Sequence, residues 1–90
     1  MNRGILEQYL LEMCQYAVEK YIDTMSQGLS IPEENKALII RYYKCECFGQ
    51  IIEWMNSGMK DDFMEQFNRF CKFSKGITAD LLRRSMETRD

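Results

Sequence analysis

The side chains best suited to metal binding or disulfide formation are the thiols of Cys14, Cys45, Cys47 and Cys71. The chain contains no histidine. A structural zinc site normally uses cysteines spaced as C-x2-C or similar. On a helix, Cys45 and Cys47 project roughly 160° apart, so they do not share a metal ion. Nothing in the sequence indicates the oxidising compartment that a disulfide framework requires. We therefore expect buried free thiols that act as small hydrophobic residues, with no metal site and no cofactor.

The sequence contains no signature of an enzyme. Histidine is the commonest general base and the partner of nucleophilic serine or cysteine, and it is missing here. Neither a phosphate-binding P-loop nor a G-x-G-x-x-G motif is present. The glutamates fall on polar faces rather than on the inward faces that a di-iron bundle needs. We expect no catalytic residues and no catalytic activity.

Charge and hydrophobicity limit the partners of the chain. Its formal net charge is −2, and Arg83-Arg84 is the only adjacent pair of basic residues that stands out. A nucleic-acid surface normally shows a basic patch, whereas two arginines suit the C-terminus of a helix. No signal peptide or membrane-length apolar run is visible. We expect a cytoplasmic protein that binds no membrane and contacts DNA only through a domain outside this chain.

The elements that carry these side chains are three predicted helices, at about 3–27, 31–57 and 61–86. Apolar residues recur at three- and four-residue steps in the first helix, and Gly28 ends it. Asp62 with Glu65 predicts the start of the third helix, which we expect to continue through Gly76. Short turns join the helices, so we expect one antiparallel all-α domain over residues 1–90.

The second helix has strong signals at both ends. Ser30 and Glu33 have the spacing of a capping box, and Pro32 suits the first turn of a helix. Gly58 follows Asn56 and Ser57 and suits the left-handed position after a helix. These residues predict the bounds 31–57.

The second helix is apolar on nearly all sides, which is its most informative property. Only a narrow strip, formed by Glu46, Gln50 and Glu53, is continuously polar. At 100° per residue, two opposite apolar groups result: Leu38, Tyr42, Cys45, Gly49 and Ile52 on one side, and Ile40, Tyr43, Cys47, Ile51 and Trp54 on the other. A helix of this kind must be covered on nearly all sides, and a chain of 90 residues has little material to do so. We therefore expect a second subunit, and we expect another backbone to approach Gly49 closely.

Residues 42–59, with the sequence YYKCECFGQIIEWMNSGM, resemble a long helix of the TetR/AcrR family of transcriptional regulators. The resemblance is to the penultimate helix of the family's C-terminal regulatory domain. Gly49, Ile51, Ile52, Trp54 and Gly58, followed by Met59, occupy the family's positions for a central glycine, two aliphatic residues, a tryptophan and a closing Gly-Met. Lys60 to Phe63 match the acidic start of the family's last helix. The family's N-terminal helix-turn-helix domain is absent from this chain.

The resemblance implies a homodimer in which the last two helices pair with those of a symmetry mate as a four-helix bundle. It also implies a cavity for a small apolar or aromatic effector beside the first helix and the first half of the second. Our candidates for the dimer interface are Phe48, Gly49, Ile52, Met55, Phe63, Phe67 and Phe70. Our candidates for the effector pocket are Met13, Tyr16, Tyr42, Tyr43 and Cys45. The sequence leaves open which side of helix 31–57 meets the partner.

The function expected from these observations is dimerisation and effector sensing in a TetR-like regulator. A second hypothesis is a free-standing helical adaptor that binds another protein through the same surface. An upstream reading frame with an intact helix-turn-helix would favour the regulator, and a native start at Met1 would favour the adaptor.

Overall fold

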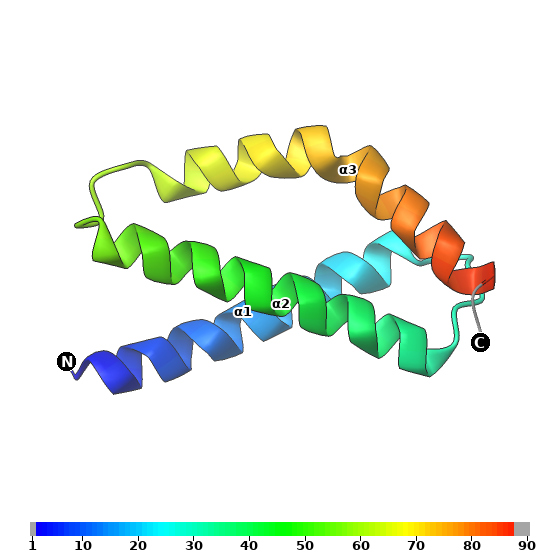
Figure 1. Cartoon of the computed structure of the whole chain (residues 1–90), viewed down its shortest axis with the longest axis horizontal. Helices are drawn as coiled ribbons and strands as arrows, with labels where there is room; N and C mark the ends of the chain where they lie inside the picture. The colour runs from blue at the N-terminus through cyan, green and yellow to red at the C-terminus, as the bar shows by residue number, and fades with distance from the viewer. Residues whose placement is uncertain (1, 88–90) are drawn as a thin grey trace.

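The computed structural model describes residues 2–87, and within that range the chain forms three helices and no strand. They are α1 (Arg3–Met25), α2 (Glu33–Asn56) and α3 (Phe63–Glu87). Figure 1 shows that consecutive helices run in opposite directions and that α1 and α2 cross near their middles. The predicted all-α class is confirmed, and α3 continues through Gly76 as expected.

Side-chain caps begin two of the three helices. The Asp62 carboxylate accepts a hydrogen bond from the Glu65 amide at 3.0 Å, which confirms the predicted start of α3. At the start of α1, the Asn2 side chain accepts a hydrogen bond from the Gly4 amide at 2.7 Å. The sequence analysis identified no cap there, although asparagine is among the preferred capping residues.

The capping box predicted at Ser30 and Glu33 is wrong. The helix begins at Glu33, and the preceding Pro32 has φ −55° and ψ 140° and makes no side-chain capping bond. A residue before proline avoids the helical region, so the helix does not extend back to Ile31, and Ser30 lies two residues before the N-cap position. The extended segment places Leu29 and Ile31 against the core instead.

The C-terminus of α2 has the geometry that the sequence predicted. Gly58 adopts a left-handed conformation with φ 93°. The Gly58 amide donates to the Met55 carbonyl at 3.2 Å, and the Met59 amide donates to the Trp54 carbonyl at 3.0 Å. This pair of hydrogen bonds is a Schellman motif, which satisfies carbonyls that the helix end leaves open.

The hydrophobic core lies at one end of the domain. Its buried residues are Val18 and Ile22 from α1, Ile39 from α2 and Leu82 from α3. Seven partly buried residues surround them: Tyr21, Met25, Leu29, Ile31, Ile40, Tyr43 and Cys47. Figure 1 shows the C-terminal end of α3 beside the turn between α1 and α2, which is where these residues meet.

Three polar contacts hold the helices together at this end. The Asn35 side-chain amide donates to the Ser85 carbonyl at 2.8 Å, which links α2 to α3. The Tyr43 hydroxyl lies 2.9 Å from the hydroxyl of Thr78, a residue that is 1% exposed. Lys36 forms an ion pair with Asp23 at 2.7 Å between α2 and α1. That ion pair is partly exposed, so it contributes less than the burial of the core.

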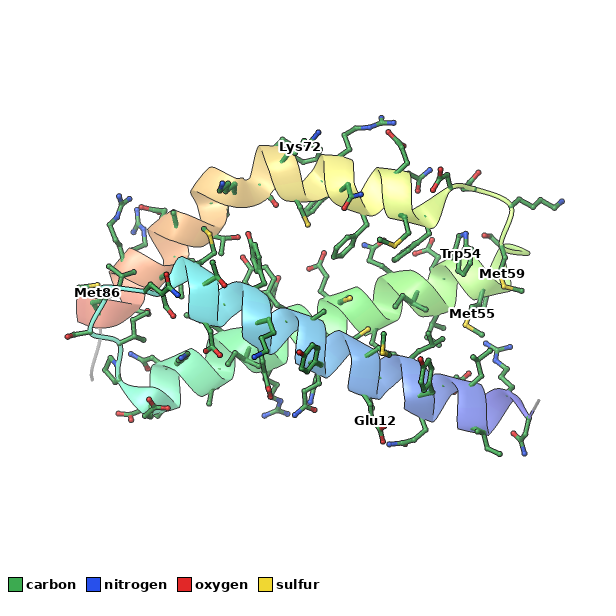
Figure 2. The ribbon with its side chains drawn as sticks, turned by 180° about the vertical axis from the view of Figure 1, so that it is seen from behind. Glu12, Trp54, Met55, Met59, Lys72 and Met86 are labelled. Carbon is green, nitrogen blue, oxygen red and sulfur yellow. The ribbon has the colours of Figure 1, made fainter. Side chains whose placement is uncertain are left out.

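The other end of the domain is much more open. No residue between 40 and 77 is buried, and neither is any described residue before Cys14. The contacts there are aromatic and half-exposed: the Trp54 and Phe63 ring centres are 5.6 Å apart, and Trp54 Nε1 donates to the Asp61 carbonyl at 2.9 Å. Figure 2 shows Trp54 and Met59 near the turn between α2 and α3. None of the helices in the described range is both long and apolar enough to cross a membrane.

Leu82 and Leu81 provide a matched test of where the core lies. Leu82 is fully buried, whereas the adjacent Leu81 is 38% exposed. We expect Leu82→Ala to lower the free energy of unfolding by about 3 kcal/mol, because it leaves a cavity in the core. We expect Leu81→Ala to lower it by about 1 kcal/mol or less. Urea unfolding at a protein concentration too low for association measures both, and equal losses would contradict the position of the core.

Candidate functional site: the free apolar faces

The structure assigns different roles to the two apolar sides of α2. Tyr43 and Cys47 pack against the core, and the Trp54 ring packs at a tilt of 42° against the Phe63 ring of α3. The opposite side faces solvent: Leu38 is 62% exposed, Tyr42 is 66% exposed, and Cys45 and Gly49 are exposed as well. The sequence did not decide which side of α2 would remain available for a partner. In the single chain it is the side that carries Leu38 and Tyr42.

The free side of α2 has the spacing of an interface between helices. Its residues are separated by alternating steps of four and three: Leu38, Tyr42, Cys45, Gly49 and Ile52. Repeats of this kind place apolar residues in one narrow seam that packs against another helix. We call this set the α2 seam. Gly49 leaves room in the middle of the seam, since a Cβ added there would have no neighbour within 4 Å.

A second exposed apolar stripe runs along α3. Phe70, Phe73 and Ile77 are 50%, 67% and 68% exposed, and Leu81 continues the stripe at 38%. The rings of Phe70 and Phe73 contact each other edge to face, with centres 5.0 Å apart. We call these four residues the α3 stripe. Figure 2 shows Lys72 on the side of α3 that faces away from α1 and α2, so the helix also carries a polar outer edge.

The accessible surface of the chain is large for its mass. It measures 6898 Å² for 10.8 kDa, whereas a compact monomer of that mass exposes about 5,500 Å². The excess is larger than the roughly 800 Å² that each partner contributes to a standard protein interface. The exposed seam and stripe contribute part of this excess, and together they are the candidate functional site.

The predicted interface residues occupy several different environments. Gly49 and Ile52 lie in the α2 seam, and Phe70 lies in the α3 stripe. Phe67 is 37% exposed and stacks on Phe63 with ring centres 6.0 Å apart. The remaining candidates are half-buried: Phe48, Met55 and Phe63. Leu38, Tyr42, Phe73 and Ile77 were not among the predicted interface residues, although regular helical spacing places them on the same faces as Gly49, Ile52 and Phe70.

The predicted effector-pocket residues are spread over the chain, and among them the Tyr42 and Tyr43 rings contact each other edge to face with centres 5.9 Å apart. Met13 and Tyr16 are 53% and 64% exposed on the outer side of α1, where Lys20 lies over the Tyr16 ring. Tyr42 and Cys45 lie in the α2 seam. Tyr43 points inward to Thr78, and its ring meets the Tyr21 ring edge to face with ring centres 6.5 Å apart. The single chain does not gather these five side chains around one space.

A shallow hollow of about 540 Å³ lies along the α2 seam. All five of its lining residues come from α2 itself: Leu38, Arg41, Tyr42, Cys45 and Glu46. Because one helix cannot enclose a ligand, the hollow is an open surface that a large partner can cover. A small-molecule site normally buries most of its ligand between several elements.

The four cysteines are all free, and only Cys14 is buried. Cys45 is exposed in the α2 seam, so the expectation that the cysteines pack as buried residues is wrong for this position. Burial raises the pKa of the Cys14 thiol from its ordinary 9.0 to about 12, and a hydrogen bond with Cys47 adds to the effect. The described residues contain no group of three side chains that could hold a metal ion.

The described residues form a small helical domain that exposes two apolar faces. Comparison with known families identifies it further. The chain matches the family TetR_C_8, described as a transcriptional regulator C-terminal region, over residues 1–76, and it belongs to that family. This confirms the resemblance that residues 42–59 suggested. Searches of curated proteins and of solved structures found no match.

Tyr43 and Tyr42 allow a test of the buried hydroxyl pair. We expect Tyr43→Phe to lower the free energy of unfolding by about 1 kcal/mol, because Thr78 loses a partner in a buried position. Tyr42 is exposed, so Tyr42→Phe should change it by less than about 0.5 kcal/mol. Chemical denaturation of both variants measures the difference. The inward orientation of Tyr43 would be contradicted if the two variants were equally stable.

Because the Cys14 thiol is buried, the free energy of unfolding should depend on pH in the alkaline range. The folded state holds the proton up to about pH 12, whereas the unfolded state releases it above about pH 9. The contribution of this thiol is therefore complete below pH 9 and declines as pH rises toward 12. We expect the melting temperature to fall more steeply between pH 9 and 11 in the natural chain than in Cys14→Ala. Parallel slopes would show that the thiol ionises equally well in both states.

Proposed function

We propose that this domain is the dimerisation domain of a TetR-like transcriptional regulator. Two copies associate through the α2 seam and the α3 stripe of each, and the four helices form a bundle about a twofold axis. The observation that carries the proposal is the exposure of an apolar heptad seam on a helix whose other side is already packed. The family supports a regulatory role, and the exposed surface supports association.

The position of the residues that remain exposed in one chain favours the association of two copies. The residues between 40 and 77 form no buried core in one chain, although they include most of its aromatic side chains. Pairing α2 and α3 with the same helices of a second copy would bury both exposed faces. An interface between identical patches of this kind is isologous, and it closes after two subunits.

Gly49 is the proposed crossing point of the two α2 helices. It is exposed, its missing side chain leaves open space, and it lies in the middle of the seam between Cys45 and Ile52. A glycine in a helix interior destabilises the helix by about 1 kcal/mol relative to alanine, so its presence needs a packing reason. Close approach of a second backbone provides that reason.

We infer that the sensing of a small apolar or aromatic effector belongs to the dimeric, intact regulator. Met13 and Tyr16 are the exposed pocket candidates outside the proposed interface, and they lie on the outer side of α1 with Tyr9 and Ile5. DNA binding would reside in a helix-turn-helix domain outside this chain, and the regulator would act in the cytoplasm. The alternative, an adaptor, would use the same two faces to bind a different protein.

Sedimentation equilibrium at micromolar concentration tests the dimer, and two glycines provide a matched pair of variants. Gly49→Leu should weaken dimerisation on the order of 10- to 100-fold, because the added side chain separates the crossing helices. Gly76 is also an exposed helical glycine with open space around it, but it lies on the polar side of α3. Gly76→Leu should therefore leave the dimer unchanged.

Both variants should keep their helical circular dichroism, since leucine is a better helix former than glycine. A monomeric natural chain would overturn the proposal and favour the adaptor. A dimer that tolerates Gly49→Leu as well as it tolerates Gly76→Leu would show that α2 does not cross its mate at this glycine.

A further inference from the structure

Two side chains of opposite charge border the α2 seam. Arg41 and Glu46 are both exposed, and together with Leu38, Tyr42 and Cys45 they line the shallow hollow along α2. The ion pairs formed among the described residues involve neither of them. A cation and a carboxylate therefore stand beside an uncovered apolar seam, where a partner that covers the seam would also meet both charges.

The two charges lie on opposite flanks of the seam. At 100° per residue, Arg41 projects roughly 60° to one side of the middle of the seam, and Glu46 projects roughly 80° to the other side. Glu53 is exposed on the same flank as Glu46. The middle of the seam is thus bordered by a cation on one flank and by two carboxylates on the other.

The relative direction of two packed α2 helices decides which flanks meet. If identical helices pack antiparallel about a twofold axis, each flank meets the same flank of the other copy. Glu46 and Glu53 of one copy would then face the same carboxylates of the other, and like charges repel. An antiparallel arrangement also leaves Arg41 on the flank away from these carboxylates.

Parallel packing gives the opposite result. The twofold axis then runs along the helices, so each seam residue faces its own copy and each flank meets the opposite flank. In the heptad defined by the seam, Arg41 occupies a g position and Glu46 occupies the e position of the next heptad. These are the two positions that form ion pairs between the helices of a parallel pair.

We propose that the two α2 helices of the dimer run parallel and in register, with two ion pairs that each join Arg41 of one copy to Glu46 of the other. The inference rests on the proposed dimer and adds the orientation of its helices. Parallel packing places Gly49 opposite Gly49 of the second copy, where the open space around this glycine lets the two backbones approach. It also places Tyr42 opposite Tyr42 and Cys45 opposite Cys45.

The two ion pairs act mainly on the choice of orientation. A partly exposed ion pair contributes little to affinity, because water and salt screen it. The burial of the apolar seam would supply the affinity in either orientation. The charges add attraction to the parallel arrangement and repulsion to the antiparallel one, and this difference selects one mode of pairing.

Charge reversal in the full chain tests the pairing, with the dissociation constant of the dimer measured by sedimentation equilibrium at low salt. Glu46→Arg sets two arginines beside each other in both pairs and should raise the dissociation constant about 10-fold. Arg41→Glu should raise it by a similar factor, because two carboxylates then meet. The double variant Arg41→Glu/Glu46→Arg restores opposite charges, so its dissociation constant should lie within about threefold of the natural value.

Glu12→Arg is the matched control, because it makes the same change in net charge as Glu46→Arg at an exposed position on α1. Figure 2 shows Glu12 on the side of α1 that faces away from α3. This variant should leave the dissociation constant unchanged. In 1 M salt, where the screening length falls to about 3 Å, the two single reversals should lose most of their effect. Circular dichroism should show the same helix content in all four variants.

The outcomes separate this inference from the dimer itself. A natural chain that dimerises, together with a double variant as weak as the single reversals, would show that Arg41 and Glu46 do not meet across the interface. An Arg41→Glu variant that dimerises like the natural chain would lead to the same conclusion. Either result would overturn the parallel arrangement and leave the proposed dimer standing, whereas a monomeric natural chain would overturn both.

Discussion

The structure depends on the mismatch between the apolar surface of α2 and the two helices available to cover it. One side of α2 packs on α1 and α3, and the core of Val18, Ile22, Ile39 and Leu82 closes where all three helices meet. The opposite side and the stripe on α3 remain exposed. A domain this small buries only roughly two-thirds of its surface, so uncovered apolar faces weigh heavily on its stability. In the dimer that we propose, a second copy would cover these faces.

This constraint divides the domain into two ends with different properties. At the end that holds the hydrophobic core, hydrogen bonds such as those of Asn35 with Ser85 and Tyr43 with Thr78 fix how α3 lies on α2. At the open end, contacts such as Trp54 with Phe63 leave the rings half-exposed.

Local sequence signals predicted the helix ends well where a residue acts on the backbone of its own turn. Asp62 caps α3, and Gly58 terminates α2 in a Schellman motif, as their residue types require. Ser30 failed as a cap because Pro32 restricts the residue before it, and that restriction took precedence over the capping-box spacing. The prediction of a backbone close to Gly49 has no counterpart within one chain, since the space around this glycine is open. The interface and pocket assignments remain predictions.

The sequence by itself determined the all-α class, the approximate helix bounds, the family and the excess of apolar surface on α2. These depend on periodicity, on capping residues and on a motif within one stretch of chain, all of which are local. Only the tertiary structure decided which side of α2 is free, that Tyr43 faces Thr78 while Tyr42 faces solvent, and that Cys14 is buried while Cys45 is exposed. Helical periodicity fixes which residues share a face. The direction of that face depends on contacts between residues far apart in the chain.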